Sequence, residues 1–300
     1  MREISTMLVE AMLGKEHVET AMLVRNAILV SSLIFNCEAW YGLTKKEVEV
    51  LEKVDEQLLR KILGCSAKTP KYLMYLELGV LPIGFIIQSR RIGFLKYILD
   101  QKDSSLVKQV FNAQNADPRS GDWISTVKKD LRKLNLNYSF DEIKQFSRFT
   151  FKNILKDHIE KAALKNLTLR IKSKGKEITY DRIEMQNYLK SDSELSLEEK
   201  KLNFKLRTRT TDLRMNMKNK NTNLECVACE KKGEINFETQ EHTFECINYV
   251  KSQVNSDLDL KEIFLNHRST DKIKHIVKHF QKTLKEREDI LKKREDNENS

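Results

Sequence analysis

The clearest hydrophobic pattern in the chain lies between residues 44 and 64. Thr44 and Glu47 have the spacing of a capping box, in which each side chain satisfies a free backbone N–H at a helix start. Gly64 has the position of a C-terminal stop. Between these signals, apolar side chains recur three or four residues apart: Val48, Leu51, Val54, Leu58, Leu59, Ile62 and Leu63. This pattern predicts one amphipathic helix.

Similar periodicity runs through most of the first 190 residues and returns near the end. We expect helices near residues 4–12, 18–40, 70–79, 82–99, 104–113, 122–134, 139–169 and 270–284. The segment 18–40 is apolar nearly all round, which predicts a helix buried inside a bundle. Three prolines and nine glycines are few for 300 residues and favour helices over strands. The expected fold is therefore all-α, with one or more helical bundles.

Polar stretches divide this pattern into four expected parts. Residues 112–121 read as a loop, and the acidic, serine-rich residues 191–199 read as a linker. The expected parts are a helical domain at 1–112, a helical extension at 122–190, a basic segment with a metal-binding module at 200–250, and a C-terminal helix with a frayed tail at 260–300.

A cluster of metal-ligand residue types lies in the third part. Cys226, Cys229, His242 and Cys246 form the pattern C-x2-C-x12-H-x3-C. A tight turn brings the first two sulfurs together, and one helical turn puts His242 and Cys246 on one face. We interpret these four residues as ligands of one structural zinc ion near the C-terminus; the alternative is a set of unpaired thiols.

The remaining cysteines and histidines change this picture little. Cys37 and Cys65 lie in apolar surroundings, so we expect buried thiols there and no disulfide. Cysteines that stay reduced are typical of a reducing compartment. His275 and His279 have helical spacing, but no further ligand completes a second site, so we expect them to face solvent. No signal-peptide pattern or membrane-spanning run is apparent, which favours an intracellular location in the nucleus or cytoplasm.

Positive charge is concentrated just before the metal ligands. The net charge of the chain is +10, and residues 200–220 carry eight basic side chains against one acid, Asp212. Cations that neutralise phosphates favour RNA or DNA as the partner. The candidate phosphate contacts are Lys205, Arg207, Arg209, Arg214, Lys218 and Lys220. The alternative is that this face is merely solvated and the helices bind another protein.

Motifs of catalysis are missing from the sequence. It has no glycine-rich phosphate loop, no G-x-S-x-G, no H-E-x-x-H and no adjacent pair of aspartates. Four protein ligands would also leave zinc without an open position for an activated water. We therefore expect no catalytic residues, no small-molecule substrate and no enzymatic activity.

Two groups of residues resemble one known family. Residues 35–41, 51–55, 59–63 and 75–82, with Thr69-Pro70, are similar to the helical thumb region that follows the palm in non-LTR (LINE-type) retrotransposon reverse transcriptases. Glu238-Thr239-Gln240-Glu241-His242, together with Glu245-Cys246, resembles the C-terminal CCHC zinc knuckle of the same proteins. The two groups occur in the order that the family has.

The resemblance implies contact with nucleic acid but no polymerase activity. The catalytic Asp-Asp of the family's palm and the residues of its endonucleases are not in this chain. We therefore expect a non-catalytic, zinc-dependent nucleic-acid-binding remnant. The rival prediction is a helical protein-interaction module with a structural zinc site and no nucleic-acid role. Exposed apolar helix faces would also favour self-association.

Overall fold

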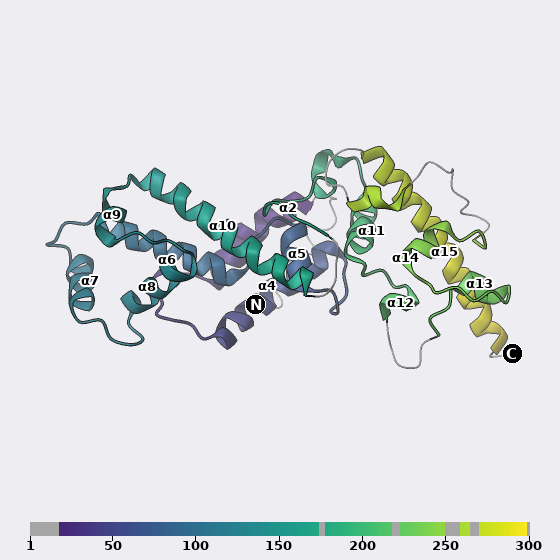
Figure 1. The fold of residues 1–300 in the computed structure, drawn as a ribbon, viewed down its shortest axis with the longest axis horizontal. Helices are drawn as coiled ribbons and strands as arrows, with labels where there is room; N and C mark the ends of the chain where they lie inside the picture. Colours follow the sequence, from purple (N-terminus) through teal and green to yellow (C-terminus); the bar gives the residue numbers. More distant parts are fainter. Residues whose placement is uncertain (1–17, 174–177, 218–222, 250–258, 265–269, 299–300) are drawn as a thin grey trace. The chain divides into compact units, whose positions relative to one another are not determined.

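The protein is described here from a computed structural model, which describes residues 18–173, 178–217, 223–249, 259–264 and 270–298 (Figure 1). The all-α prediction is confirmed, because this part of the chain contains helices and two isolated β-bridges but no strand. None of the described helices is both long and apolar enough to cross a membrane. The helix expected at residues 4–12 lies outside the described residues.

Contacts between backbone positions divide the described chain into two compact units. Unit 1 comprises residues 20–59 and 70–185, and unit 2 comprises residues 60–69 and 186–298, apart from the undescribed gaps. The helical elements up to residue 172 are α2 Val18–Val24, the π-helix η1 Arg25–Val30, α3 Ser31–Leu33, η2 Cys37–Ala39, α4 Lys45–Leu63, α5 Lys71–Glu77, α6 Ile83–Leu99, α7 Leu106–Ala116, α8 Trp123–Lys133, α9 Phe140–Gln145 and α10 Arg148–Lys172.

Unit 1 is built around α6, which packs against η2, α7, α8, α9 and α10. Its largest apolar cluster joins α6 to the helices that follow it, and includes Ile92, Leu95, Leu131, Phe151 and Ile159. The long helix α10 runs beside α6 in Figure 1. The helices expected in the separate ranges 1–112 and 122–190 therefore share one hydrophobic core.

A buried ion pair ties the first helical segment of unit 1 to α4. The guanidinium of Arg25 donates through Nε and Nη2 to the two carboxylate oxygens of Asp55, both at 2.6 Å. The two side chains are 1% and 0% exposed. Because an unpaired charge costs several kcal/mol in such a setting, these two residues depend on each other.

The expected helix at 18–40 is shorter and less buried than predicted. Regular helix ends at Leu33, and Asn36 adopts a left-handed conformation with φ of 56°. Leu23 and Ile28 are exposed, whereas Arg25 is buried. The segment 18–40 is thus not buried on all sides, although apolar residues occupy nearly every face of the expected helix.

Two helix starts read from the sequence are confirmed, and one interruption was missed. The capping boxes at Thr44 and Ser139 are both formed. The helix expected at 139–169 is instead two helices, because Phe146 is extended and Ser147 starts α10 by accepting the N–H of Thr150. The phenyl ring of Phe146 packs against Tyr138 and Phe151, which fixes this corner.

Unit 2 consists of short elements and one long helix. They are η3 Asn187–Leu189, η4 Ser191–Ser193, α11 Leu197–Thr208, α12 Arg214–Met217, α13 Val227–Lys231, α14 Gln240–Glu245, η6 Leu260–Phe264 and α15 Thr270–Glu298. Helix α15 packs against α11, α13, α14 and η6 (Figure 1). It continues to Glu298, so the tail expected to fray after residue 285 is helical up to that point.

The expected linker at 191–199 and the basic segment after it are folded. Ser196 and Glu199 form a capping box that begins α11. Phe204 and Leu206 of α11 are fully buried although they lie on different sides of the helix. The serine-rich composition therefore marked a helix start instead of a linker.

Candidate metal centre

Two short helices position the four predicted ligands. Cys226 is the N-cap residue of α13, and Cys229 lies one turn later in the same helix. His242 lies in α14, and Cys246 is the C-cap residue of that helix. The hydroxyl of Thr239 accepts the backbone N–H of His242 at 3.0 Å and so fixes where α14 begins. The predicted helical spacing of His242 and Cys246 is confirmed.

A tight reversal of the chain brings the two helices together. Gly233 has φ of 75°, which favours glycine, and its N–H donates to the Glu230 carbonyl at 3.1 Å. The returning strand-like segment forms an isolated bridge between Glu225 and Phe237. The N–H of Cys226 also donates to the Asn236 carbonyl at 2.6 Å. These bonds place the first pair of sulfurs opposite His242 and Cys246.

The distances between ligand atoms fit a tetrahedral centre. The Sγ of Cys246 lies 3.8 Å from that of Cys226 and 3.6 Å from that of Cys229. The Nε2 of His242 lies 3.3 Å from the Cys229 sulfur, and all four ligand atoms lie within 4.8 Å of one another. Metal–sulfur bonds of about 2.3 Å give sulfur–sulfur edges of about 3.8 Å in a tetrahedron. The four side chains therefore lie where one metal ion can bind them all.

Further donors surround the thiols. The side-chain amides of Asn236 and Asn248 donate to the Cys229 sulfur at 3.5 and 3.3 Å, and the Cys226 thiol lies 3.8 Å from the Tyr249 hydroxyl, to which it donates. Donors of this kind stabilise thiolate charge and orient the ligands. Sequence reasoning missed these three residues, because their spacing forms no recognisable motif.

Burial favours the protonated form of two of the thiols, those of Cys226 and Cys246, when no metal is bound. It raises the pKa of the Cys246 thiol to about 12 and also raises the pKa of Cys226. Metal ligation requires thiolates, so binding must release protons and the metal affinity must rise with pH.

Helix α15 packs against this module and holds it through rings and ion pairs. Phe244 stacks on Phe280 and meets the ring of His279 edge-on. Arg287 donates to both carboxylate oxygens of the fully buried Glu238 at 2.8 and 3.0 Å. Contacts with α15 therefore contribute to the ordering of the module.

The expectation for His279 is wrong, whereas His275 does face solvent. His279 is buried, and its Nε2 lies 3.1 Å from the carbonyl oxygen of Phe244, to which it donates. Burial lowers the pKa of His279. His275, four residues earlier on α15, lies on the exposed face of the helix.

Among the predicted phosphate contacts, Arg207 requires a correction. Its side chain is 1% exposed; the guanidinium donates to the Ile263 carbonyl at 2.6 Å and to the Gln186 side chain at 3.2 Å. It also lies over the ring of Tyr188. The side chain of Arg207 packs in the core of unit 2 and its guanidinium donates to groups there, so Arg207 does not face a ligand.

The other predicted contacts differ in how much of them reaches solvent. Arg214 is largely covered, and it donates to the Glu230 carboxylate at 2.9 Å and to the Glu225 carbonyl at 2.8 Å. Arg209 is exposed and pairs with Glu241 at 2.8 Å, while the half-exposed Lys205 lies 4.0 Å from Asp212. Lys218 and Lys220 lie outside the described residues.

A row of exposed lysines on α15 was not predicted. Lys278, Lys282, Lys285 and Lys292 follow one another at helical spacing on the face that points away from the buried Ile276 and Phe280. Asp289 interrupts the row. None of the four lysines forms an ion pair within the part of the chain that the structure describes. Lys278 and Lys282 lie in the helix expected at 270–284, whereas Lys292 lies in the part that was interpreted as a frayed tail.

Comparison with known proteins finds no match to this chain. No protein-family model, no curated protein and no solved structure matches it, so its likeness to the thumb and knuckle of a reverse transcriptase rests on the quoted residues alone.

Proposed function

We propose that Cys226, Cys229, His242 and Cys246 hold one structural zinc ion. Three thiolates and one imidazole at tetrahedral distances form a ligand set that suits zinc among the common metals. Four protein ligands complete the coordination, so the ion has a structural role and leaves no position for a reacting water.

We further propose that unit 2 binds RNA or DNA when zinc is present. The observation that carries this proposal is the row of unpaired lysines on α15, the helix that packs on the metal-binding module. Lysines at helical spacing present several positive charges along one line, as a phosphate backbone requires. Lys205 and Arg209 stay candidates for additional contacts.

The likeness to a retrotransposon reverse transcriptase fits this function. A thumb-like segment followed by a CCHC knuckle corresponds to the non-catalytic, nucleic-acid-contacting part of such a protein. We propose that the chain is a remnant of that kind, which acts by binding and not by catalysis.

Fluorescence anisotropy with labelled RNA and DNA tests the proposal. In the zinc-loaded chain, replacing Lys278, Lys282 and Lys285 together by glutamate should abolish measurable binding at moderate salt. Removing three phosphate contacts should also reduce the slope of log affinity against log salt by about 2 to 3.

A matched control separates a specific surface from net charge. Lys46, Lys53 and Lys102 are exposed lysines of unit 1, and replacing them by glutamate changes the total charge equally. This control should bind almost as the unmodified chain does. Equal losses in both variants, or no binding of either nucleic acid by the unmodified chain at low salt, would contradict the proposal.

One observation favours the rival function, a protein-interaction module. Ile235, Phe237 and Ile247 lie in the metal-binding module and are 80%, 60% and 76% exposed. Large apolar side chains gathered on a small module are typical of a protein contact. If this rival is correct, the unmodified chain should not bind RNA or DNA, and replacing all three residues by serine should abolish self-association or partner capture.

A further inference from the structure

A groove in unit 1 lies among α4, α5, α6, α8 and α10, well separated in sequence from the metal ligands. It consists of two hollows of about 450 and 910 Å³ that share Glu52, Lys71, Gln88, Lys133 and Arg170 in their walls. Because they share these side chains, the hollows are neighbours. The groove is large enough for a ligand of several linked groups.

The groove contains more positive charge than its own acids neutralise. Lys71 pairs with Glu52 at 2.7 Å and with Glu56 at 2.9 Å, and Arg91 pairs with Asp130. Lys45 lies 3.8 Å from Glu49. Three further lining cations, Lys129, Lys133 and Arg170, are exposed and have no acidic partner within the described residues. Like charges gathered in a concave surface favour an anionic ligand.

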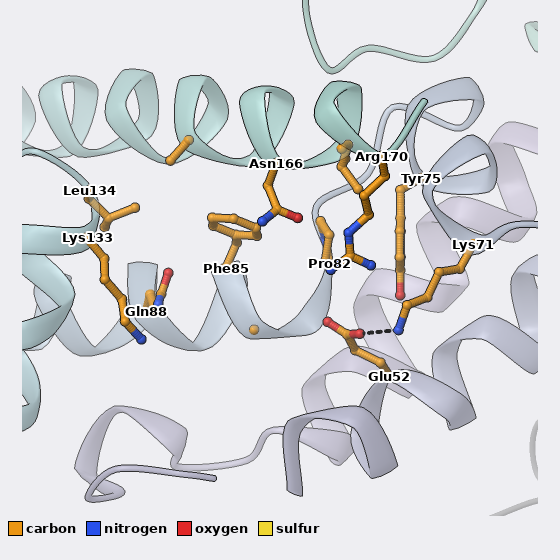
Figure 2. A pocket seen from close by; sticks show the side chains of 13 residues that line it. Glu52, Lys71, Tyr75, Pro82, Phe85, Gln88, Lys133, Leu134, Asn166 and Arg170 are labelled. Carbon is orange, nitrogen blue, oxygen red and sulfur yellow. Dashed lines mark hydrogen bonds and ion pairs between the residues drawn. The ribbon is translucent and has the colours of Figure 1, made fainter. Parts of the chain in front are cut away.

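Ring and amide groups lie between these cations. Figure 2 shows Phe85 and Asn166 side by side between Lys133 at one end and Arg170 at the other. The amide of Asn166 has no hydrogen-bond partner in the described chain, and Phe85 is only partly buried. An exposed phenyl edge or face offers a surface for a flat ring, and an amide both donates and accepts at the edge of such a ring.

A buried hydroxyl at the Arg170 end also lacks a partner. Tyr75 lines the groove and is 1% exposed, yet its phenolic oxygen makes no hydrogen bond. In Figure 2 this oxygen lies beside the Lys71–Glu52 pair. Leaving such a group unsatisfied costs about 1–3 kcal/mol, a cost that a polar ligand atom would remove.

We propose that this groove binds a nucleotide, with its phosphate against Arg170 and its base against Phe85 and Asn166, while Lys133 at the other end attracts the anionic ligand and can contact a second phosphate group. The proposal does not rest on the zinc site or on the α15 lysines, since every residue in it belongs to unit 1. A free nucleotide and a nucleotide within a strand present the same phosphate and base. The experiment must therefore compare both sources.

Isothermal titration of the full, zinc-loaded chain provides the test, with adenosine monophosphate, a trinucleotide and inorganic phosphate as separate ligands. Replacing Lys133 and Arg170 together by alanine should weaken nucleotide binding by at least about tenfold. The control replaces Arg132 and Lys172, two exposed neighbours that do not line the groove. It removes the same residue types and the same charge, and should bind normally.

Two further variants separate this site from other effects. Phe85→Leu keeps an apolar side chain in the core but loses the ring, and should weaken binding by at least about fivefold. The triple glutamate variant of α15 should leave binding in the groove unchanged. If the α15 variant loses only its binding to RNA or DNA, the loss concerns unit 2 and not the groove.

The outcomes are decisive in either direction. If adenosine monophosphate binds and its binding depends on Lys133 and Arg170, the groove is a free-nucleotide site. If only the trinucleotide binds, with the same dependence, the groove is a strand-binding site. The proposal is overturned if neither ligand binds, if the control variant loses as much affinity, or if inorganic phosphate binds as tightly as the nucleotide.

Discussion

The two units of this protein are stabilised by different means. Unit 1 has a large apolar cluster shared by α6, α8 and α10, and it also buries the charged pairs Arg25–Asp55 and Arg91–Asp130. The metal-binding module of unit 2 has a small buried cluster, made mainly of its own cysteines, Ala228 and Tyr249. The first unit has enough apolar contact to fold by burial, whereas we propose that the module depends on a metal ion that joins its ligands.

The largest expected difference follows from removing the metal. Cys229→Ser, or a strong chelator, should unfold residues 224–249, because a structural zinc ion contributes on the order of 10 kcal/mol to such a module. Unit 1 should keep its stability. Hydrogen-exchange mass spectrometry resolves the two units, and Cys65→Ser, outside the ligand set, serves as the control. Fast exchange throughout the chain would show that the units do not differ in this way.

Removing the buried ion pair of unit 1 should destabilise unit 1 and leave the metal-binding module of unit 2 unchanged. Asp55→Ala leaves the Arg25 guanidinium buried without its carboxylate and should destabilise unit 1 by about 3–5 kcal/mol. Zinc content should not change. Glu49→Ala removes the exposed partner of Lys45 and should cost at most about 0.5 kcal/mol in the same denaturant titration. If the two variants lose similar amounts of unfolding free energy, the burial of the Arg25–Asp55 pair does not make it more important for stability than an exposed pair.

A smaller and equal effect is expected from the capping boxes. Ser139→Ala in unit 1 and Ser196→Ala in unit 2 each remove a hydroxyl that accepts a backbone N–H at a helix start. Each should cost about 1 kcal/mol in its own unit. Thermal unfolding followed by hydrogen exchange measures both, and a loss confined to one site would sharpen the contrast between the units.

The smallest effect concerns pH in unit 2. Burial lowers the pKa of His279, so the unfolded chain takes up this proton first as the pH falls. The stability due to neutral His279 is present above the unfolded value of about 6.5 and decreases below it. His279→Gln should reduce the difference in stability of unit 2 between pH 7.5 and pH 5.5. An unchanged difference would exclude His279 as its source.

The sequence predicted local features better than it predicted burial. The capping boxes at Thr44 and Ser139 and the ligand spacing from Cys226 to Cys246 depend on residues close in the chain, so their pattern could be read directly. The corner at Phe146 was missed, since it depends on ring contacts with Tyr138 and Phe151.

Charged residues show where sequence reasoning failed. Arg207 stands in a basic run, yet it is buried because Gln186 and Ile263 offer acceptors from distant positions. The lysine row of α15 begins within the expected helix 270–284 and continues past its expected end, and the sequence did not show which face of that helix is packed. In both cases, only the packed partners reveal which face of a helix is covered.

The metal content of the purified chain tests the central claim most directly. Mass spectrometry under native conditions, with elemental analysis of the same sample, should find one zinc ion per chain and none after replacing Cys226 and Cys229 together by serine. A zinc content below about half an equivalent in the unmodified chain would contradict the account, because the structural site would then not exist.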